Sequence, residues 1–404
     1  MKICMFTNTY LPHVGGVARS VHFFAEDLRR MKHEVLVIAP TFADETASLE
    51  KDEELLRVPA IQNFNGSDFS VRIPIPFFID EKIDEFKPDV IHSHHPFLLG
   101  DAAIRAAYRR NLPLVFTHHT LYEQYTHYVS ADSAIMQQLA IHLSTEYANL
   151  CTRVIAPSES IASLIEKRGV TTPIDVIPTG VDVGHFQNGN GQAFRQANTI
   201  PKDAVVLGHL GRLAPEKNLE YLCDATIQAI QKNPEHLYFL VVGSGPSTPQ
   251  IEDAFSRAGL QKRLIMAGEK SGTDLADAYN AMDLFIFSSH SETQGMVLVE
   301  AMSASLPVIA LDASGVREVV KDQKNGRLLP ADATSGDFAD AILQYVKENS
   351  KESAWRKEAQ ETAQLFSRER SAEKVLALYH SLHKEQQRKM AAQKDEIEPW
   401  QDLI

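Results

Sequence analysis

Short apolar segments that alternate with helical segments constrain the fold of this chain more than any other feature. "KICMFTN", "HEVLVIAP", "DVIHSH", "PLVFTHH", "RVIAPS" and "DVIPTG" have the length and composition of buried strands, and helical stretches separate most of them. Strands that alternate with helices form βαβ units, and such units build a parallel sheet that is buried on both faces. The first half of the chain is therefore predicted to be an α/β domain.

The same alternation restarts after a polar segment, residues 183–203, which is rich in Gly, Asn and Gln and predicts a linker with room for a short helix. Beyond it, "AVVLGHLG", "LYFLVVG", "RLIMAG", "LFIFSS", "LPVIAL" and "GRLLP" are predicted strands. A chain of 404 residues is long enough for two domains. We predict two doubly wound parallel-sheet domains, residues 1–185 and 203–370, followed by a helix and a charged tail, residues 371–404. Two such domains enclose a cleft, and ligands bind beyond the carboxyl ends of the strands.

The charge balance excludes some partners. The formal net charge is -13, which argues against nucleic acid as the main partner and against docking onto anionic lipid by charge alone. No stretch approaches ~20 apolar residues, so we expect no membrane-spanning helix. The chain starts in a strand-like run without a signal-peptide layout, and its three cysteines form no C-x-x-C pair. These features predict a cytoplasmic protein with reduced thiols.

A glycine pair, Gly15 and Gly16, lies between the first predicted strand and the first predicted helix, in "YLPHVGGVARS". Glycines there let the backbone approach a ligand, and the helix N-terminus behind them favours a phosphate. A plain tight turn explains the pair equally well. The spacing is not G-x-G-x-x-G, and the second strand ends in "APTF" without an acid for a ribose, so a nicotinamide site is disfavoured.

Two cations, Arg212 and Lys217, lie around the loop that follows the first strand of the second domain, in "GHLGRLAPEKNLEYL". The pair suits a diphosphate, because Arg binds phosphate as a fork and Lys as a point charge. The alternative is two solvated surface charges, which is the usual fate of a lone lysine.

Two carboxylates flank an apolar stretch in "HSETQGMVLVEAMSAS": Glu292 in a predicted loop and Glu300 in the helix that follows. The amides of Gly295, Met296 and Val297 form the positive end of that helix. If the whole stretch were helical, the carboxylates would be ~12 Å apart. A hydrolytic glycosidase pair is closer, roughly 5 to 9.5 Å. The arrangement instead suits an extended ligand with a phosphate in the middle, such as a nucleotide sugar.

Together, the E-x7-E motif, the G-R-x4-K motif and the Gly-Gly loop resemble those of the family-4 glycosyltransferases of the GT-B fold, and the resemblance covers nearly the whole chain. It implies two Rossmann-like domains that face each other across a cleft, the first for the acceptor and the second for the nucleotide sugar. The final helix, from about Ser371, would cross back to the N-terminal domain. The resemblance also implies a retaining hexosyltransferase that needs no metal or cofactor, in which the leaving phosphate accepts the proton of the acceptor.

Carried over by motif position, the resemblance implies that Glu292 contacts the donor sugar, that Glu300 contacts the ribose, and that Arg212 and Lys217 hold the diphosphate. Thr293 and Gln294 depart from the aromatic residue or proline that many members have before the glycine, so the motif does not indicate which donor is used; we favour a UDP-glucose type. From the resemblance and the arguments above, the further donor-binding candidates are Gly15, Gly16, Gly243, Gly245, Lys270, Gln294, Gly295, Met296 and Val297.

Two histidine clusters close predicted strands, "HSHHPF" and "THHT". Imidazoles bind zinc, but neither cluster has a carboxylate at ligand spacing and the chain has no D-x-D pair, so a metal site is disfavoured. The resemblance places His119 beside the reacting sugar as a hydrogen-bond donor. His118 is then a packing residue, or the two histidines exchange roles.

The acceptor is predicted from weaker signals. "HHPFLLG" and "THHTLYEQYTHY" are similar to the subgroup that glucosylates diacylglycerol, although such enzymes commonly have a basic N-terminal domain. Tyrosines spaced by three residues are most often core, but these follow the histidine cluster. The candidate acceptor contacts are His13, His118, Tyr122 and Tyr125. We therefore expect a lipid or glycan acceptor, with peripheral contact of the N-terminal domain at the inner membrane face as a further expectation.

The leading hypothesis is a retaining glycosyltransferase that moves a hexose from a nucleotide diphosphate sugar to a hydroxyl group. One alternative is a GT-B epimerase, which would convert the donor without an acceptor. Another is a non-catalytic nucleotide-sugar-binding protein, which would bind the donor without turnover.

Overall fold

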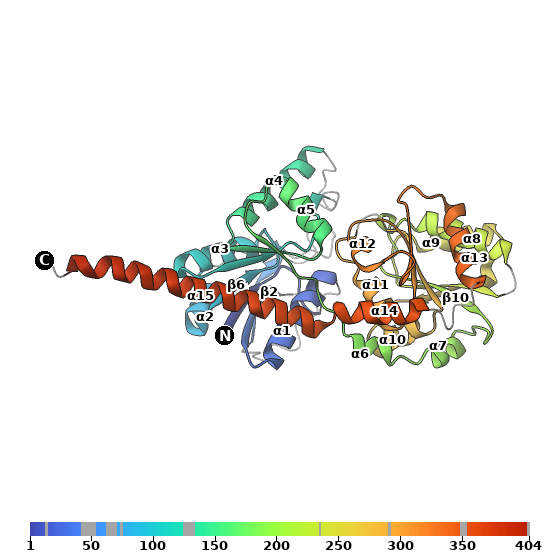
Figure 1. Cartoon of the computed structure of the whole chain (residues 1–404), viewed down its shortest axis with the longest axis horizontal. Helices are drawn as coiled ribbons and strands as arrows, with labels where there is room; N and C mark the ends of the chain where they lie inside the picture. Colours follow the sequence, from blue (N-terminus) through green and yellow to red (C-terminus); the bar gives the residue numbers. More distant parts are fainter. Residues whose placement is uncertain are drawn as a thin grey trace. The chain divides into compact units, whose positions relative to one another are not determined.

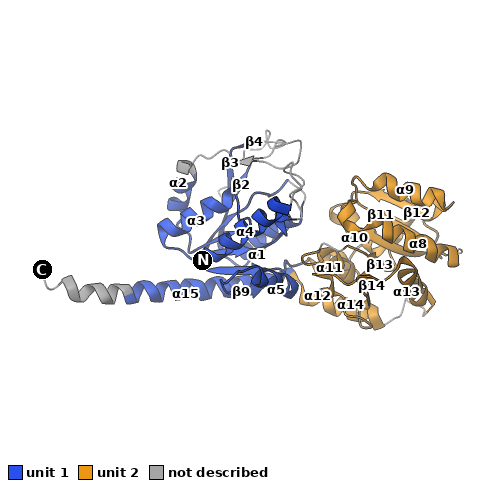
Figure 2. Cartoon of the chain, turned by 90° about the horizontal axis from the view of Figure 1, so that it is seen from above, with its two compact units in different colours: residues 1–180, 368–404 blue, residues 181–367 orange. Residues whose placement is uncertain are grey.

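The computed structural model describes residues 1–12, 15–41, 54–61, 71–72, 76–123, 134–233, 236–289, 292–347 and 354–401. The chain divides into two compact units (Figure 2). Unit 1 comprises residues 1–180 and 368–404, and unit 2 comprises residues 181–367. The first division falls five residues before the predicted end of the N-terminal domain, 185.

Unit 1 contains, in its described part, a seven-stranded parallel sheet (Figure 1). From edge to edge its strands are β3 (Leu55–Val58), β2 (Glu34–Pro40), β1 (Lys2–Phe6), β6 (Val90–Ser93), β7 (Leu114–Thr117), β8 (Arg153–Ala156) and β9 (Ile174–Val176). The six predicted strands are confirmed, and β3 is an additional edge strand. A separate antiparallel pair joins β4 (Ala60–Ile61) to β5 (Val71–Arg72).

Helices cover both faces of this sheet. Alternate residues of β1 point to opposite sides: Ile3 and Met5 pack with two helices, and Cys4 and Phe6 pack toward the other face. The helices on the first side are α1 (Gly16–Arg30) and α15 (Arg368–Gln401). Those on the second are α2 (Pro76–Phe86), α3 (Leu99–Arg110), α4 (Ala134–Asn149) and α5 (Glu159–Lys167).

The last helix, α15, packs on α1 and so belongs to unit 1 (Figure 1). Its first residue, Arg368, is buried, and its guanidinium donates to Asp27 at 3.0 and 2.7 Å. Arg368 also lies 4.3 Å from the ring centroid of Phe23. A buried cation needs such partners, and they attach the start of α15 to α1.

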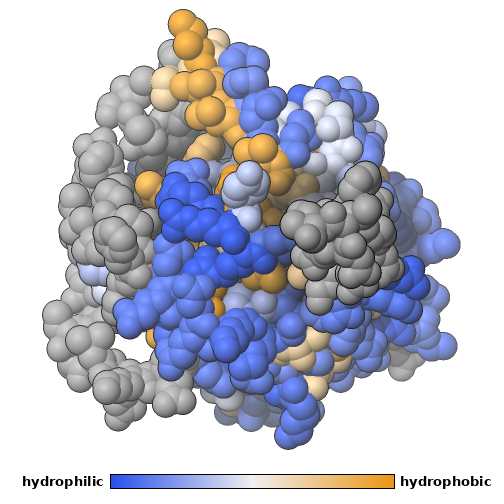
Figure 3. All heavy atoms as spheres, turned by 90° about the vertical axis from the view of Figure 1, so that its left-hand side faces the viewer, coloured by the Kyte–Doolittle hydropathy of each residue, from blue (hydrophilic) through white to orange (hydrophobic). Residues whose placement is uncertain are grey.

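One helix of unit 1 carries an exposed apolar side. Ile135, Leu139 and Leu143 of α4 are exposed by 78%, 44% and 46%. Because they are spaced by four residues, they lie on one side of the helix. Figure 3 shows apolar side chains gathered at one edge of an otherwise largely hydrophilic face. Among the described helices, none is both long and apolar enough to cross a membrane.

Unit 2 contains, among its described residues, a six-stranded parallel sheet with helices on both faces. From edge to edge the strands are β12 (Leu264–Gly268), β11 (Leu237–Val242), β10 (Val205–Leu210), β13 (Leu284–Phe287), β14 (Val308–Leu311) and β15 (Gly326–Leu329). On one face lie α8 (Leu219–Lys232), α9 (Thr248–Arg257) and α13 (Ser335–Lys347). On the other lie α6 (Val183–Gln187), α7 (Gly191–Ala197), α10 (Gly272–Asn280), α11 (Met296–Ser303), α12 (Val316–Val319) and α14 (Ala354–Leu365). The described residues of the unit also form two short 3-10 helices, η4 (Pro215–Lys217) and η5 (Gln261–Arg263).

The predicted linker, residues 183–203, is instead part of unit 2, where it forms α6 and α7. Val183, Phe186 and Phe194 are buried in the core of this unit. Asp182 and Asn190 cap the two helices by accepting a backbone N–H with their side chains. The few apolar residues of the segment are therefore core residues.

The order of the strands determines that predicted site residues of each unit lie at one edge of its sheet. In unit 2 the order reverses between β10 and β13, and ligands of open parallel sheets bind at the carboxyl ends of the strands beside such a switch point. Arg212 and Lys217 follow β10, and Glu292 follows β13. In unit 1 the switch lies between β1 and β6, which Gly15 and His94 follow.

Candidate functional site

The segment that carries Lys217 is held by the end of the neighbouring strand. The hydroxyl of Ser288 donates to the carbonyl oxygens of Lys217 and Asn218 at 3.1 and 3.0 Å. The hydroxyl of Ser289 donates to the carbonyl oxygen of Glu216 at 3.2 Å. Both serines are fully buried and directly follow β13. They fix η4 against the strand that leads to Glu292.

Lys217 and Glu292 meet. The Nζ atom of Lys217 lies 3.2 Å from Oε2 of Glu292, and the two side chains are exposed by 20% and 17%. The other carboxylate oxygen of Glu292 accepts the backbone N–H of Gly295 at 3.2 Å. Glu292 therefore joins a cation of one loop to the amide that precedes α11. The preceding residues, His290 and Ser291, lie outside the described part.

Gly315, which the sequence did not single out, supports the backbone of this loop. A Cβ atom at Gly315 would lie 2.7 Å from the nitrogen of Gln294 and 2.9 Å from the carbonyl oxygen of Glu292. Its φ of 73° is also one that residues with a side chain rarely adopt. The close approach of Gly315 lets residues 292–294 lie where they do. The sequence signal that could have identified Gly315 is its position between a predicted strand and the segment that follows.

Arg212 lies in the same loop as Lys217 but has a different partner. Its side chain is 48% exposed and forms an ion pair with Glu216. The predicted glycines Gly243 and Gly245 pack against the loop of Arg212: a Cβ atom at Gly243 would lie 2.0 Å from the carbonyl oxygen of Gly211. Both glycines thus support the cationic loop. Lys270 follows β12 and is half-buried.

The predicted ribose contact, Glu300, is fully buried in α11. Its carboxylate accepts a hydrogen bond from the hydroxyl of Tyr279 at 2.8 Å. A ribose reaches Glu300 only if neighbouring side chains move. Around the start of α11, Gln294 is buried, while Met296 and Val297 are half-buried.

His209 lies on β10 in the core of unit 2. Its ring stacks with those of Phe285 and Phe287, and Nδ1 lies 3.3 Å from the carbonyl oxygen of Ile286. Burial lowers the pKa of His209 to about 4. His209 is therefore neutral near pH 7 and serves as a local hydrogen-bonding residue of the core.

In unit 1, Gly15 and Gly16 begin α1. Gly15 has an extended backbone and its carbonyl oxygen accepts the amide of Arg19 at 3.0 Å. Gly16 is exposed, and a Cβ atom there would meet no described atom within 4 Å. The space beside Gly16 is open to a ligand, and a plain turn remains compatible with it. Two candidate acceptor contacts, His13 and Tyr125, lie outside the described residues.

His119, which the resemblance places beside the reacting sugar as a catalytic residue, has a histidine partner. Its Nε2 lies 2.9 Å from Nδ1 of His94, and the two rings stack with centroids 5.2 Å apart. His94 is fully buried and His119 half-buried. Burial holds the pKa of both imidazoles well below the usual range, and neighbouring histidines lower it further. Both rings are therefore neutral near pH 7.

The other histidines of the two clusters are buried among hydroxyl and aromatic groups. His92 contacts Tyr379 of α15 and Thr117 through its two ring nitrogens. His118 is buried, its ring lies edge-on to Tyr122, and burial lowers its pKa to about 4. Nδ1 of His118 and the Tyr122 hydroxyl are buried without a hydrogen-bond partner in the described residues.

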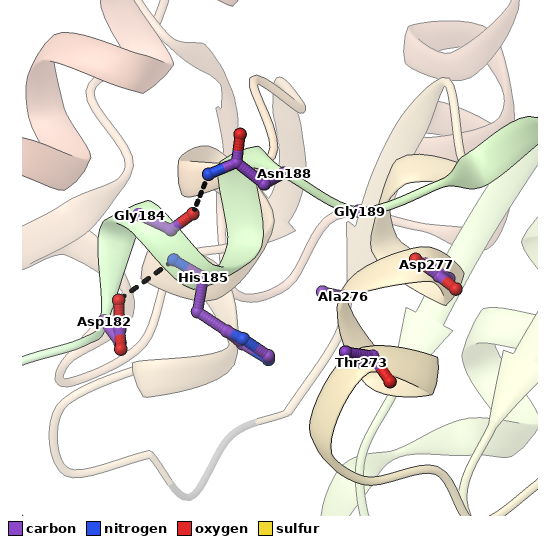
Figure 4. Close-up of a pocket in the computed structure, with 8 residues that line it drawn as sticks. All are labelled: Asp182, Gly184, His185, Asn188, Gly189, Thr273, Ala276 and Asp277. Atoms are coloured by element: carbon purple, nitrogen blue, oxygen red, sulfur yellow. Dashed lines mark hydrogen bonds between the residues drawn. The ribbon is translucent and has the colours of Figure 1, made fainter.

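Nowhere in the described part do three or more His, Cys, Asp or Glu side chains converge in a way that could hold a metal ion. A depression of about 420 Å3 lies elsewhere on unit 2, between α6 and α10 (Figure 4). It is lined by Asp182, Gly184, His185, Asn188, Gly189, Thr273, Ala276 and Asp277. None of these is a predicted site residue, and several of their polar groups bond within the unit: Asp182 accepts the N–H of His185, and Asp277 accepts the N–H of Asn190.

Comparison with known families agrees with the two-unit organisation. The profile of "Glycosyltransferase Family 4" matches residues 14–185, and that of "Glycosyl transferases group 1" matches residues 190–362.

Relatives with several activities align over most of the chain. The alpha-monoglucosyldiacylglycerol synthase of Streptococcus pneumoniae is 28% identical over 358 residues, 86% of this chain and 78% of that protein. The GDP-mannose-dependent alpha-mannosyltransferase of Mycobacterium tuberculosis is 28% identical, with 87% of this chain and 89% of that protein covered. The D-inositol 3-phosphate glycosyltransferase of Actinosynnema mirum is 30% identical, with 72% of each chain covered.

Solved structures share the fold. HepE of Anabaena in complex with UDP-glucose superimposes with a TM-score of 0.73 at 21% identity, over 94% of this chain and 100% of that one. Sucrose-phosphate synthase of Thermosynechococcus elongatus gives a TM-score of 0.73 at 20% identity, over 94% and 98%. This chain therefore belongs to glycosyltransferase family 4 and has the GT-B fold.

Proposed function

We propose that this glycosyltransferase moves a hexose from a nucleotide diphosphate sugar to a hydroxyl group of a lipid or glycan, with retention of configuration and without a metal ion. The observation that carries the proposal is the pair of Lys217 and Glu292 beside the amide of Gly295, at the switch point of unit 2. This geometry brings together a cation, an N–H donor and an acceptor, and a bound donor would replace contacts that these groups make with one another.

The charges fit a diphosphate. Glu292 balances the charge of Lys217 and holds the cation in place. A diphosphate between Lys217 and the exposed Arg212 would gain charge-assisted hydrogen bonds from both. Glu292 would then accept hydrogen bonds from sugar hydroxyls. Because two cations and a helix end supply the positive charge, we propose that no metal is required.

The proposed transfer breaks the bond between the anomeric carbon of the sugar and the phosphate oxygen. The acceptor oxygen forms a new bond to that carbon, and its proton passes to the leaving phosphate. Attack on the face that the phosphate leaves retains the configuration and needs no enzyme nucleophile. Lys217 and Arg212 stabilise the charge that develops on the phosphate, and His119 of unit 1 donates a hydrogen bond to the sugar.

The comparisons support a donor class but not one donor. HepE was solved in complex with UDP-glucose, and one relative named above depends on GDP-mannose. We propose a UDP-glucose-type donor because of the likeness to the diacylglycerol enzymes.

The exposed side of α4 supports a lipid acceptor. Ile135, Leu139 and Leu143 would each gain burial in the surface of a membrane. The helix contains no Lys or Arg, so attraction to anionic lipid is not the source of this contact. We propose that unit 1 touches the membrane peripherally through α4.

A thermal-shift screen with UDP-, GDP- and ADP-sugars tests donor binding, because a ligand at 100 times its Kd stabilises the native state by about 2.7 kcal/mol. Lys217→Met should weaken binding about 10- to 100-fold, the range expected for a lost charged hydrogen bond. The matched control is Lys232→Met. Lys232 pairs with Asp340 at 2.6 Å on an exposed surface of the same unit, and its loss should leave binding unchanged.

Two results would contradict the proposal: equal donor binding by the Lys217→Met and wild-type proteins, or stabilisation by none of the nucleotide sugars. Conversion of the donor to an isomer without an acceptor would instead identify an epimerase.

A further inference from the structure

A buried ring nitrogen of His94, Nε2, has no hydrogen-bond partner in the described part of the chain. The other ring nitrogen, Nδ1, lies 2.9 Å from Nε2 of His119. A contact of this length between two neutral imidazoles needs one donor and one acceptor. The two rings therefore cannot choose their tautomers independently.

Two arrangements satisfy the contact. In the first, His94 donates from Nδ1, its Nε2 is a bare acceptor, and His119 carries its proton on Nδ1. In the second, His119 donates from Nε2, and the proton on Nε2 of His94 becomes a buried N–H without an acceptor. Orphaned N–H donors are rarer in protein interiors than acceptors that lack a donor. A doubly protonated ring is disfavoured because His94 is fully buried and the half-buried ring of His119 stacks on it.

His94 is also held against rotation. Its backbone N–H donates to the carbonyl oxygen of Phe6 at 2.9 Å, and its ring centroid lies 4.0 Å from that of His92. The ring of His92 is fixed by contacts of 2.5 Å to the Tyr379 hydroxyl and 2.7 Å to the Thr117 hydroxyl. The ring of His94 is thus packed on a neighbour that cannot turn without loss of two hydrogen bonds.

We propose that His94 is a positioning residue that keeps His119 in the Nδ1–H tautomer, so that His119 presents an N–H donor to an oxygen of the bound sugar. The inference rests on the proposed function only in assigning a sugar as the partner of His119. The tautomer itself follows from the contacts within unit 1.

The direct test is the nitrogen NMR spectrum of the full-length protein labelled with 15N-histidine. The resonances of His119 are assigned by their loss in His119→Gln. We expect a protonated Nδ1 and a bare Nε2 at pH 7.5 in the wild-type protein. An unprotonated Nδ1 of His119 would overturn the proposal. This measurement does not depend on whether a variant of His94 folds.

Two nearly isosteric variants of His94 test its role. His94→Asn keeps an amide N–H near the position of Nδ1 and should preserve the tautomer, whereas His94→Leu should give a mixture of tautomers. For transfer, we expect kcat/KM to fall about tenfold in His94→Leu and to stay within about threefold of wild type in His94→Asn. Circular dichroism and thermal melting confirm that both variants fold. His142→Gln, on the exposed part of α4, is the control that removes a histidine without an effect on His119.

A His94→Leu protein that keeps both the tautomer and the transfer rate of wild type would also overturn the proposal. Failure of the proposed function is recognised separately. If wild-type protein transfers no sugar from any donor, the function is wrong, while the nitrogen spectrum still decides the tautomer of His119.

Discussion

Gly315→Ala should disable the Lys217–Glu292 site without a disruption of the fold. The new Cβ atom would lie 2.7 Å from the nitrogen of Gln294, whereas Cβ atoms in proteins essentially never come within 3.0 Å of such an atom. Residues 292–294 must therefore move by about 0.3 Å (3.0 minus 2.7) or more. This minimum shift already takes up more than half of the about 0.5 Å within which an active site has to be held. We expect kcat/KM to fall at least tenfold.

The same substitution also places a side chain at a φ of 73°. A residue other than glycine in such a sparsely populated backbone conformation costs roughly 1–3 kcal/mol. Gly259→Ala is the matched control, because Gly259 has a φ of 71° and a Cβ atom there meets no described atom within 4 Å. Gly259 lies in unit 2 beyond the end of α9, away from Glu292. Both variants place a side chain at a positive φ, and only Gly315→Ala should lose the geometry of the site.

The assay compares steady-state transfer and donor binding in both variants, with thermal melting as the measure of the fold. Donor affinity and kcat/KM should fall in Gly315→Ala and remain near wild type in Gly259→Ala. If the two variants behave alike in transfer, the contact of Gly315 with residues 292–294 does not control the site, and the reasoning fails.

Three further predictions concern other parts of the molecule. Burial lowers the pKa of His118 and His209 to about 4, so between about pH 6.5 and 4 the unfolded chain binds protons that the folded one does not. The free energy of unfolding should therefore be lower at pH 5 than at pH 7, with each histidine contributing at most about 1.4 kcal/mol per pH unit. Urea unfolding curves that give the same free energy of unfolding at pH 5 and pH 7 would contradict this. Glu300→Gln keeps an acceptor for the hydroxyl of Tyr279. If the carboxylate binds the ribose, calorimetry should show about tenfold weaker binding of the free nucleoside diphosphate, because a hydrogen bond to a charged group is worth that much. Unchanged affinity would mean that Glu300 has a structural role. Serine at both Leu139 and Leu143 should reduce sedimentation with phosphatidylcholine vesicles, while added salt should not; undiminished sedimentation would remove α4 as the contact.

Much of the site could be predicted because parallel sheets impose a common edge. Lys217 and Glu292 are 75 positions apart in the sequence, yet each follows a strand, and the strands β10 and β13 are neighbours in the sheet. Strand recognition and the rule that ligands bind at carboxyl ends were enough to place both side chains at one edge of the sheet, while their assignment to one ligand came from the family resemblance and the strand order from the structure.

Other features depend on contacts that leave little trace in a single sequence. The edge strand β3 has only two clearly buried residues, Leu56 and Val58, so its apolar signal is short. The segment 183–203 was predicted to be a linker because it is mostly polar, but Phe186 and Phe194 anchor its two helices in the core. The low apolar content of this segment did not prevent helix formation, because two buried aromatic residues attach the helices to the core and two side chains cap them.

The partner of His119 shows the same limit. Both histidine clusters were recognised, and their positions after β6 and β7 place them at one edge of the sheet. Which histidine of "HSHHPF" meets His119 depends on side-chain directions and on register. Similarly, the burial of Glu300 depends on Tyr279, a residue of another helix.

The most direct test of the account is sugar transfer measured in a single turnover, with wild-type and Glu292→Gln proteins. The donor is the nucleotide sugar that stabilises the protein most in the screen, the acceptor is diacylglycerol in mixed micelles, and excess EDTA is present. Glu292→Gln keeps an acceptor for the amide of Gly295 but removes the charge that pairs with Lys217. The account predicts a glycolipid with the anomeric configuration of the donor from wild-type protein, undiminished by EDTA, and at least a hundredfold slower transfer by the variant. Equal rates for the two proteins, or a product with inverted configuration, would contradict it.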